Sequence, residues 1–272
     1  MIRVELLKLF RRPRTWMTIG LLDALPTVVA ILLAITGIGP RPGQGPAFLS
    51  AVLTNGSLFA VAALAIVLPL FLPVAVAVVA GDTVAGEAQA GTLRYLLIRP
   101  VGRTRLLVAK LVSVFAFVLT AVLVVSGTGY LVGRALLGNQ PLSEVAVSSV
   151  SGTSLTPGQI AGRTVLAIGY VAFSMLGVAA VALFLSTVTD SALSASMGAL
   201  AILIGSSLLL TIDASRALQP YLPTRYWLSF IDLFRDPILW RNVLRGIALQ
   251  GVYVVVLLGA AWANFTTKDV TS

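Results

Sequence analysis

The sequence predicts an all-α integral membrane protein in which one domain, residues 1–272, contains six transmembrane helices. Hydrophobic residues make up 58% of the chain, and its mean hydropathy is +0.98. Only 11% of the residues are charged, whereas a soluble domain carries about 25%. A helix needs about 20 apolar residues to cross a bilayer. Apolar runs near this length occupy residues 16–38, 57–80, 106–132, 163–187, 191–211 and 245–265.

Residues 1–14 precede the first apolar run and combine five basic residues with a regular apolar pattern. Ile2, Leu6, Leu9 and Pro13 share one side of a helix, and the charged residues lie elsewhere. We therefore expect an amphipathic helix in the headgroup plane, with its arginines on lipid phosphates. A plain basic leader is the alternative.

The distribution of lysine and arginine predicts the topology. Five basic residues precede the first span and five more lie in 81–110, whereas the first and third loops carry one each. Because loops rich in lysine and arginine stay inside, the N-terminus and residues 81–105 are expected in the cytoplasm. Six spans return the C-terminus to the same side. The chain is thus expected to be a multi-pass protein of the plasma membrane.

Residues 213–244 are expected outside, as a re-entrant or interfacial segment between spans five and six. Trp227, Phe230, Ile231 and Phe234 share one helical face, which suits short interfacial helices. Asp236-Pro237 predicts an early start for the last span. The arginines of this segment argue against an external position. The alternative is that residues 163–211 cross an odd number of times, which would place the segment inside.

The stretch Gly81–Lys110 is the most polar interruption in the N-terminal half of the chain. It carries the carboxylates Asp82 and Glu87 as well as five basic residues. A short helix is expected after Thr92, a candidate N-cap, and it should end before Pro100, which cannot donate a backbone N–H. On residues alone, this stretch could be a loop whose arginines only set topology.

The same stretch resembles the signature of ABC type-2 permeases, the membrane subunits of many export-type ABC transporters. The matching pattern is Glu87-x3-Gly91-Thr92-Leu93-x2-Leu96-Leu97-x2-Pro100-x2-Arg103-x6-Lys110. The resemblance implies that residues 81–105 form a cytoplasmic coupling region that docks on a separate ATPase subunit. It also implies a second permease chain, identical or related, and short external helices between the last two spans.

The resemblance assigns roles to the residues of this pattern. Glu87 would make a charged contact at the ATPase interface or at the base of span two. Thr92 would cap the coupling helix. The apolar surface seated on the ATPase would be formed by Leu93, Leu96 and Leu97. Gly91, Pro100, Arg103 and Lys110 complete the set of expected coupling residues.

The composition excludes several kinds of chemistry. The chain has no cysteine and no histidine, so thiolate, disulfide and imidazole chemistry are absent. The sequence contains no G-x4-G-K-[ST] motif for ATP phosphates. We expect no catalytic residue, metal or cofactor on this chain, and ATP and Mg²⁺ on the partner ATPase. The basic residues flank apolar runs, which favours lipid contact over nucleic acid.

Asp23 lies within the first apolar run. An aspartate at mid-membrane costs about 2.5–3.5 kcal/mol on insertion scales. It could line the substrate path, or it could lie near the headgroups or pair with a basic group inside the bundle. Span five opens with small residues at a spacing of four, among them Ser191, Ala195 and Ala199, which suits close helix packing within the chain or across a dimer.

The function expected from the sequence is the permease subunit of an ABC exporter for a hydrophobic or amphipathic substrate such as a drug or lipid. The alternative is a secondary transporter or channel without an ATPase partner. Ion coupling would require ionisable groups inside the membrane, and Asp23 offers little support for it.

Overall fold

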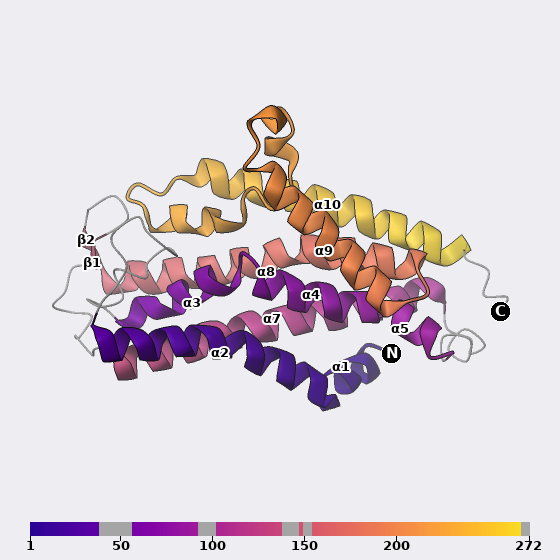
Figure 1. Cartoon of the computed structure of the whole chain (residues 1–272), viewed down its shortest axis with the longest axis horizontal. Coiled ribbons are helices and arrows are strands. Elements are labelled where there is room, and N and C mark those ends of the chain that lie inside the picture. Colours follow the sequence, from indigo (N-terminus) through magenta and orange to yellow (C-terminus); the bar gives the residue numbers. More distant parts are fainter. Residues whose placement is uncertain (38–55, 92–101, 138–146, 149–153, 268–272) are drawn as a thin grey trace.

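The computed structural model describes residues 1–37, 56–91, 102–137, 147–148 and 154–267. The long helices run alongside one another as a single bundle (Figure 1). The helices of the first half are α1 (Ile2–Arg11), α2 (Pro13–Thr36), η1 (Gly56–Leu58), α3 (Phe59–Val67), α4 (Phe71–Asp82), α5 (Ala85–Gln89) and α7 (Arg103–Leu136). The second half contains β1 (Val147–Ser148), β2 (Ser154–Leu155), α8 (Pro157–Val188), α9 (Ala192–Leu209), η2 (Asp213–Ser215), η3 (Gln219–Tyr221), η4 (Trp227–Phe234) and α10 (Trp240–Thr267).

Among the described residues, five helices are long and apolar enough to cross a membrane: α2, α7, α8, α9 and α10. A sixth span is formed if Gly56–Val67 and Phe71–Asp82, which are bent by 60° at their junction, cross as one. The multi-pass helical prediction is therefore confirmed. Some helices are longer than the apolar runs: α8 begins at Pro157, because Thr156 and Gln159 form a reciprocal capping box.

The expected amphipathic helix over 1–14 is shorter than predicted. α1 ends at Arg11, and Pro13 is the first residue of α2 rather than part of its apolar face. Arg12 between them is extended, as a residue before proline prefers. The Thr15 hydroxyl and the Trp16 indole N–H donate to the carbonyls of Leu9 and Phe10, which closes the corner.

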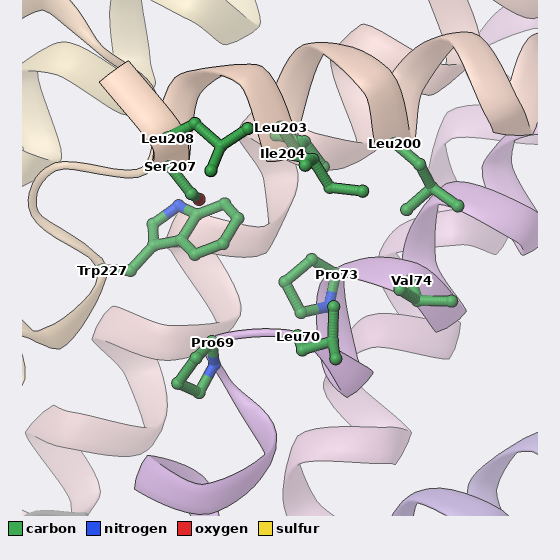
Figure 2. A pocket seen from close by; sticks show the side chains of 10 residues that line it. All are labelled: Pro69, Leu70, Pro73, Val74, Leu200, Leu203, Ile204, Ser207, Leu208 and Trp227. Carbon is green, nitrogen blue, oxygen red and sulfur yellow. The ribbon is translucent and has the colours of Figure 1, made fainter. Parts of the chain in front are cut away.

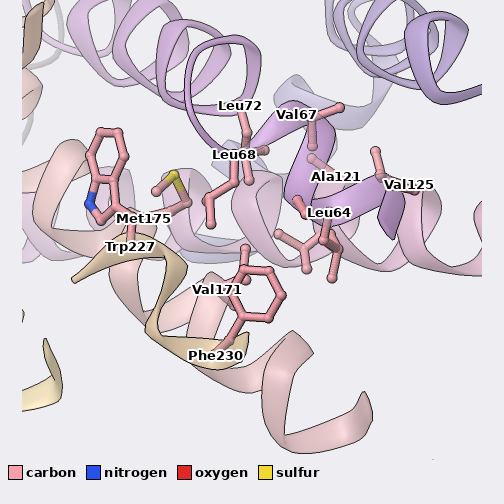
Figure 3. Packing of buried hydrophobic residues seen from close by; sticks show 14 of the residues in the cluster. Leu64, Val67, Leu68, Leu72, Ala121, Val125, Val171, Met175, Trp227 and Phe230 are labelled. Carbon is pink, nitrogen blue, oxygen red and sulfur yellow. The ribbon is translucent and has the colours of Figure 1, made fainter. Parts of the chain in front are cut away.

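The bent span lies at the centre of the packing. Pro69 has no backbone N–H for a continuous helix, and the chain resumes as α4 at Phe71. α3 packs mainly on α7, whereas α4 packs on α8 and α9. Figure 3 shows the core around the bend, where side chains from four segments meet. They are Leu64, Leu68 and Leu72 of the bent span, Ala121 of α7, Val171 and Met175 of α8, and Phe230 of η4.

Residues 213–239 form three short 3-10 helices, of which η4 packs against α8 and α10. The expected apolar face is largely confirmed, because Trp227, Phe230 and Phe234 are buried. The last helix starts before the apolar run at 245–265, as expected, but its first residue is Trp240 rather than one near Pro237. The Asp236–Pro237 peptide is cis, and α10 begins at Trp240, so residues 240–244 belong to that helix.

Hydrogen bonds tie this segment to the long helices. The Tyr170 hydroxyl donates to the carbonyl of Tyr226 at 2.6 Å, and Arg163 donates to the carbonyl of Arg235 at 2.9 Å. The buried Gln250 of α10 donates to the carbonyl of Pro223 at 2.6 Å. Since buried backbone carbonyls need such partners, these contacts hold the chain around η4 against the bundle.

The N-terminus, α5 and the end of α10 lie at one end of the bundle, and β1 and β2 lie at the other (Figure 1). This arrangement agrees with an even number of spans between the two termini. We call the end that carries α5 the basal end.

Candidate functional site

A cluster of five charged side chains joins three segments at the basal end. We call it the basal charge cluster, and it consists of Lys8, Arg12, Asp82, Glu87 and Lys110. Lys8 and Arg12 come from α1 and the corner after it, Asp82 and Glu87 from the base of the bent span, and Lys110 from α7. Residues 70 and 79 positions apart in the sequence therefore pair here.

Glu87 is the centre of the cluster. Its Oε1 lies 2.6 Å from Nζ of Lys8, and its Oε2 lies 2.6 Å from Nζ of Lys110. Only 8% of the Glu87 side chain and 1% of the Lys110 side chain are exposed, whereas 38% of Lys8 is exposed. Lys110 also donates to the carbonyl of Thr83. A buried lysine needs such partners, and here it has both a carboxylate and a carbonyl.

The charges determine the protonation state of Glu87. Burial acts to raise the pKa of the carboxyl group, but the charges and hydrogen bonds of Lys110 and Lys8 outweigh burial and hold the pKa below its ordinary value of 4.5. Glu87 therefore stays ionised at neutral pH. A group that keeps its charge and touches two ammonium groups suits a structural or coupling role and does not suit a general acid.

The backbone around Glu87 is fixed by a serine from another span. Ser186 of α8 accepts hydrogen bonds from the N–H groups of Val84 and Ala85 at 3.1 and 2.9 Å. Its own hydroxyl donates to the carbonyl of Gly81 at 2.7 Å. Ser186 is fully buried, so it satisfies three backbone groups at the break between α4 and α5 that water cannot reach.

Gly91 ends α5 in the left-handed conformation, with a φ of +67°. This region is open to glycine at little cost and is unfavourable for most other residues. The structure thus gives a physical reason for glycine at this position of the pattern.

Arg103 of the pattern lies at the start of α7 and faces the end of α10. Its guanidinium donates to the carbonyls of Phe265 and Thr266 at 3.4 and 2.9 Å. A cation is stabilising at the C-terminal carbonyls of a helix. Trp262 of α10 donates to the Thr104 hydroxyl at 2.9 Å, so the same two helix ends are joined twice.

The remaining coupling residues of the pattern, Thr92, Leu93, Leu96, Leu97 and Pro100, lie outside the described residues. The coupling helix expected there stays a prediction. The structure brings together Glu87 and Lys110, which sequence analysis had named, and adds Lys8 and Ser186, which it had not.

Asp23 lies apart from the basal charge cluster, within α2. It is half-buried, and it accepts a hydrogen bond from the hydroxyl of Thr128 in α7. This contact gives the carboxylate a polar partner between two helices. A role in the substrate path stays a prediction.

The described residues contain no group of three acidic, histidine or cysteine side chains that could hold a metal ion. Both carboxylates of the basal charge cluster are paired with basic side chains. The cluster links α5 to α1 and α7, because a displacement of α5 alone would break the two ion pairs of Glu87.

The fold and the cluster define a class: a multi-pass helical membrane protein whose basal segment is linked to the ends of several spans. Residues 1–191 match the model of the ABC-2 family transporter proteins. The chain belongs to this family, and it is therefore a membrane subunit of the ABC permease type rather than a catalytic subunit. A search of curated proteins found no match.

Proposed function

We propose that the chain is the permease subunit of an ABC exporter that moves a hydrophobic or amphipathic substrate, such as a drug or lipid, outward across the plasma membrane. ATP and Mg²⁺ bind a separate cytoplasmic ATPase, and a second permease chain completes the transporter. The N- and C-termini and residues 81–105 face the cytoplasm. Family membership supports a permease, and direction, substrate and partners are our inference.

The observation that carries the proposal is the double pairing of Glu87. One carboxylate holds α1 through Lys8 and α7 through Lys110, and Ser186 links the adjacent backbone to α8. A displacement of the segment that follows α5 would therefore be passed to α1, α7 and α8 together. These contacts would let the closure of the ATPase dimer change the arrangement of the spans.

This geometry refines the expected role of Glu87. The side chain is buried within the chain at the base of the bent span, which favours the second of the two roles expected from sequence. Contact with the ATPase is then left to Leu93, Leu96 and Leu97. Burying one leucine is worth about 1.5–3 kcal/mol, so loss of two should weaken docking by tens-fold or more, since about 1.4 kcal/mol is tenfold.

The test is a comparison of two variants, each expressed together with the partner ATPase subunit. Leu93→Ala/Leu97→Ala should insert normally and lose the ATPase on co-purification. Glu87→Gln should keep the ATPase bound and still allow ATP hydrolysis, but that hydrolysis should no longer drive transport. The matched control is Leu131→Ala, on the exposed face of α7, which should do neither. A double leucine variant that inserts, binds ATPase and transports like wild type would overturn the coupling role.

A transport assay in vesicles separates this proposal from a secondary transporter or channel. Export should require ATP and the ATPase subunit, and it should survive collapse of the ion gradients. Transport by the chain alone that follows an ion gradient would favour the rival.

A further inference from the structure

The bend in the second span opens an apolar cavity of about 260 Å³ between α4, α9 and η4. Its walls include Pro69, Leu70 and Pro73 at the bend, Leu200 and Ile204 on α9, and Trp227 of η4 (Figure 2). An apolar cavity of roughly 150 Å³ is enough for a benzene ring. This cavity therefore has room for a ligand of more than six carbons.

The cavity has a polar end and an apolar end. Ser207 and Leu208 line it near the last turn of α9, on the side of Trp227, whereas Leu200 and Val74 lie at the far side in Figure 2. Seven residues separate Leu200 from Ser207, which is about 10 Å along a helix. The cavity thus follows α9 from the middle of that helix toward its C-terminal end at Leu209.

Trp227 presents an unused hydrogen-bond donor at the polar end. The residue is 5% exposed, and its indole N–H is buried with no hydrogen-bond partner in the described part of the chain. A buried indole N–H normally has an acceptor. In Figure 2 its nitrogen lies on the side of the ring toward Ser207. An acceptor arriving with a ligand would satisfy this donor.

The mouth of the cavity is lined by side chains that face outward. Leu70, Ile204 and Leu208 are each at least half exposed. Ile204 and Leu208 belong to α9, which qualifies as a membrane span, and Leu70 lies at the break of the bent pair. In a membrane these side chains meet lipid, so the molecules nearest the mouth are lipid acyl chains. The ester carbonyl of a glycerolipid is a strong acceptor at the boundary between the acyl chains and the headgroups.

We propose that this cavity binds one acyl chain of a bilayer glycerolipid, with the ester carbonyl accepting a hydrogen bond from Nε1 of Trp227 and the chain extending along α9 toward Leu200. The proposal needs only the membrane position of α4 and α9 and does not depend on the direction of transport or on the ATPase. It accounts for an apolar cavity that ends at a buried, unsatisfied donor.

The experiment uses the full chain in bilayer nanodiscs that contain a phospholipid with a photoactivatable group in its acyl chain. After irradiation, mass spectrometry locates the labelled residues. Labels should fall on the inner wall around Leu200 and Val74. The same probe with an ether linkage, which lacks the carbonyl, should label this wall about two- to tenfold less, as expected for the loss of one hydrogen bond.

Two variants complete the test. Trp227→Phe keeps an aromatic ring without the donor, and it should remove the preference for the ester probe. Leu200→Trp fills the cavity and should remove wall labelling, whereas Leu193→Trp on the exposed face of α9 should leave it unchanged. Equal ester and ether labelling in the wild type, or labels confined to outward-facing residues, would overturn the proposal. The ester-to-ether comparison is made on the wild type and holds even if a variant fails to fold.

Discussion

Glu87 and Lys110 form an ion pair of 2.6 Å in which both side chains are more than nine-tenths buried. Neither residue is free to relax toward water. The pair joins the base of the bent span to α7, and Lys8 extends it to α1. The loss of stability when this pair is broken therefore measures how firmly the base of the bent span, α7 and α1 are held together.

Removing the carboxylate should strongly destabilise the protein. Glu87→Ala leaves the Lys110 ammonium buried without its counter-charge, and breaking a buried pair in this way costs about 3–5 kcal/mol. Lys8→Ala removes a partly exposed partner and should cost about 0–1 kcal/mol. Thermal unfolding in nanodiscs measures both.

A double variant controls for the burial argument. In Glu87→Leu/Lys110→Met no charge remains buried, so most of the lost stability should return. Equal stability of Glu87→Ala and Lys8→Ala would show that Lys110 reaches water after the substitution, and the pair would then not be a rigid link.

The stability due to Glu87 should depend on pH in acid. Its pKa in the folded chain lies below the ordinary value of 4.5, so the folded state binds the proton less readily than the unfolded state. The contribution is fully present above about pH 4.5 and is lost as the pH falls through the folded pKa. The difference in melting temperature between wild type and Glu87→Gln should be constant near neutral pH and shrink in acid. A difference that grows in acid would contradict this sign.

The positions of the spans could be predicted from apolar runs because burial in lipid requires length and composition, which are local properties. Details set by single side chains were less accessible. The early start of α8 depends on the capping box of Thr156 and Gln159. In the sequence these two residues lie in a polar stretch that is typical of a loop. The 60° bend depends on Pro69 inside a long apolar run, where a proline is compatible with a straight or a bent span.

The candidate site was only half predictable for a different reason. Glu87 and Lys110 were named from a spaced pattern, but Lys8 is 79 residues from Glu87 and Ser186 is about 100 residues from the backbone that it caps. A single sequence does not show which distant residues pair. Nothing in the sequence distinguishes Ser186 from the other small residues of an apolar helix. The orphan donor of Trp227 likewise exists only once η4 has packed on the bend.

A pair of glycines in α7 tests the packing on the bent span. A Cβ at Gly133 would lie 2.2 Å from the carbonyl oxygen of Gly56 and 2.5 Å from Cβ of Phe59. Gly133→Ala should therefore force the backbones apart and cost about 1–3 kcal/mol. Gly127, on the same helix, has nothing within 4 Å of that position, so Gly127→Ala should be neutral or stabilise the helix by up to about 1 kcal/mol. Similar effects in both variants would show that the close contact of Gly133 with η1 and α3 does not decide the outcome.

The sidedness of the bundle can be measured by cysteine labelling, because the natural chain has no cysteine. Gly102 lies at the basal end, and Gly158 follows β2 at the opposite end; both are exposed. The count of basic residues places the basal end inside. In intact cells an impermeant thiol reagent should label Gly158→Cys and leave Gly102→Cys unmodified until the membrane is opened.

The same assay decides the position of η2, where the arginine count and the number of spans disagree. Ala214 is exposed on η2, and six spans place it on the side of Gly158. Ala214→Cys should therefore react from outside at a rate close to that of Gly158→Cys. Protection of Ala214→Cys together with labelling of Gly158→Cys would mean that residues 163–211 cross the membrane an odd number of times. In that case α9 would be a re-entrant segment, and the chain would have five spans with its C-terminus outside.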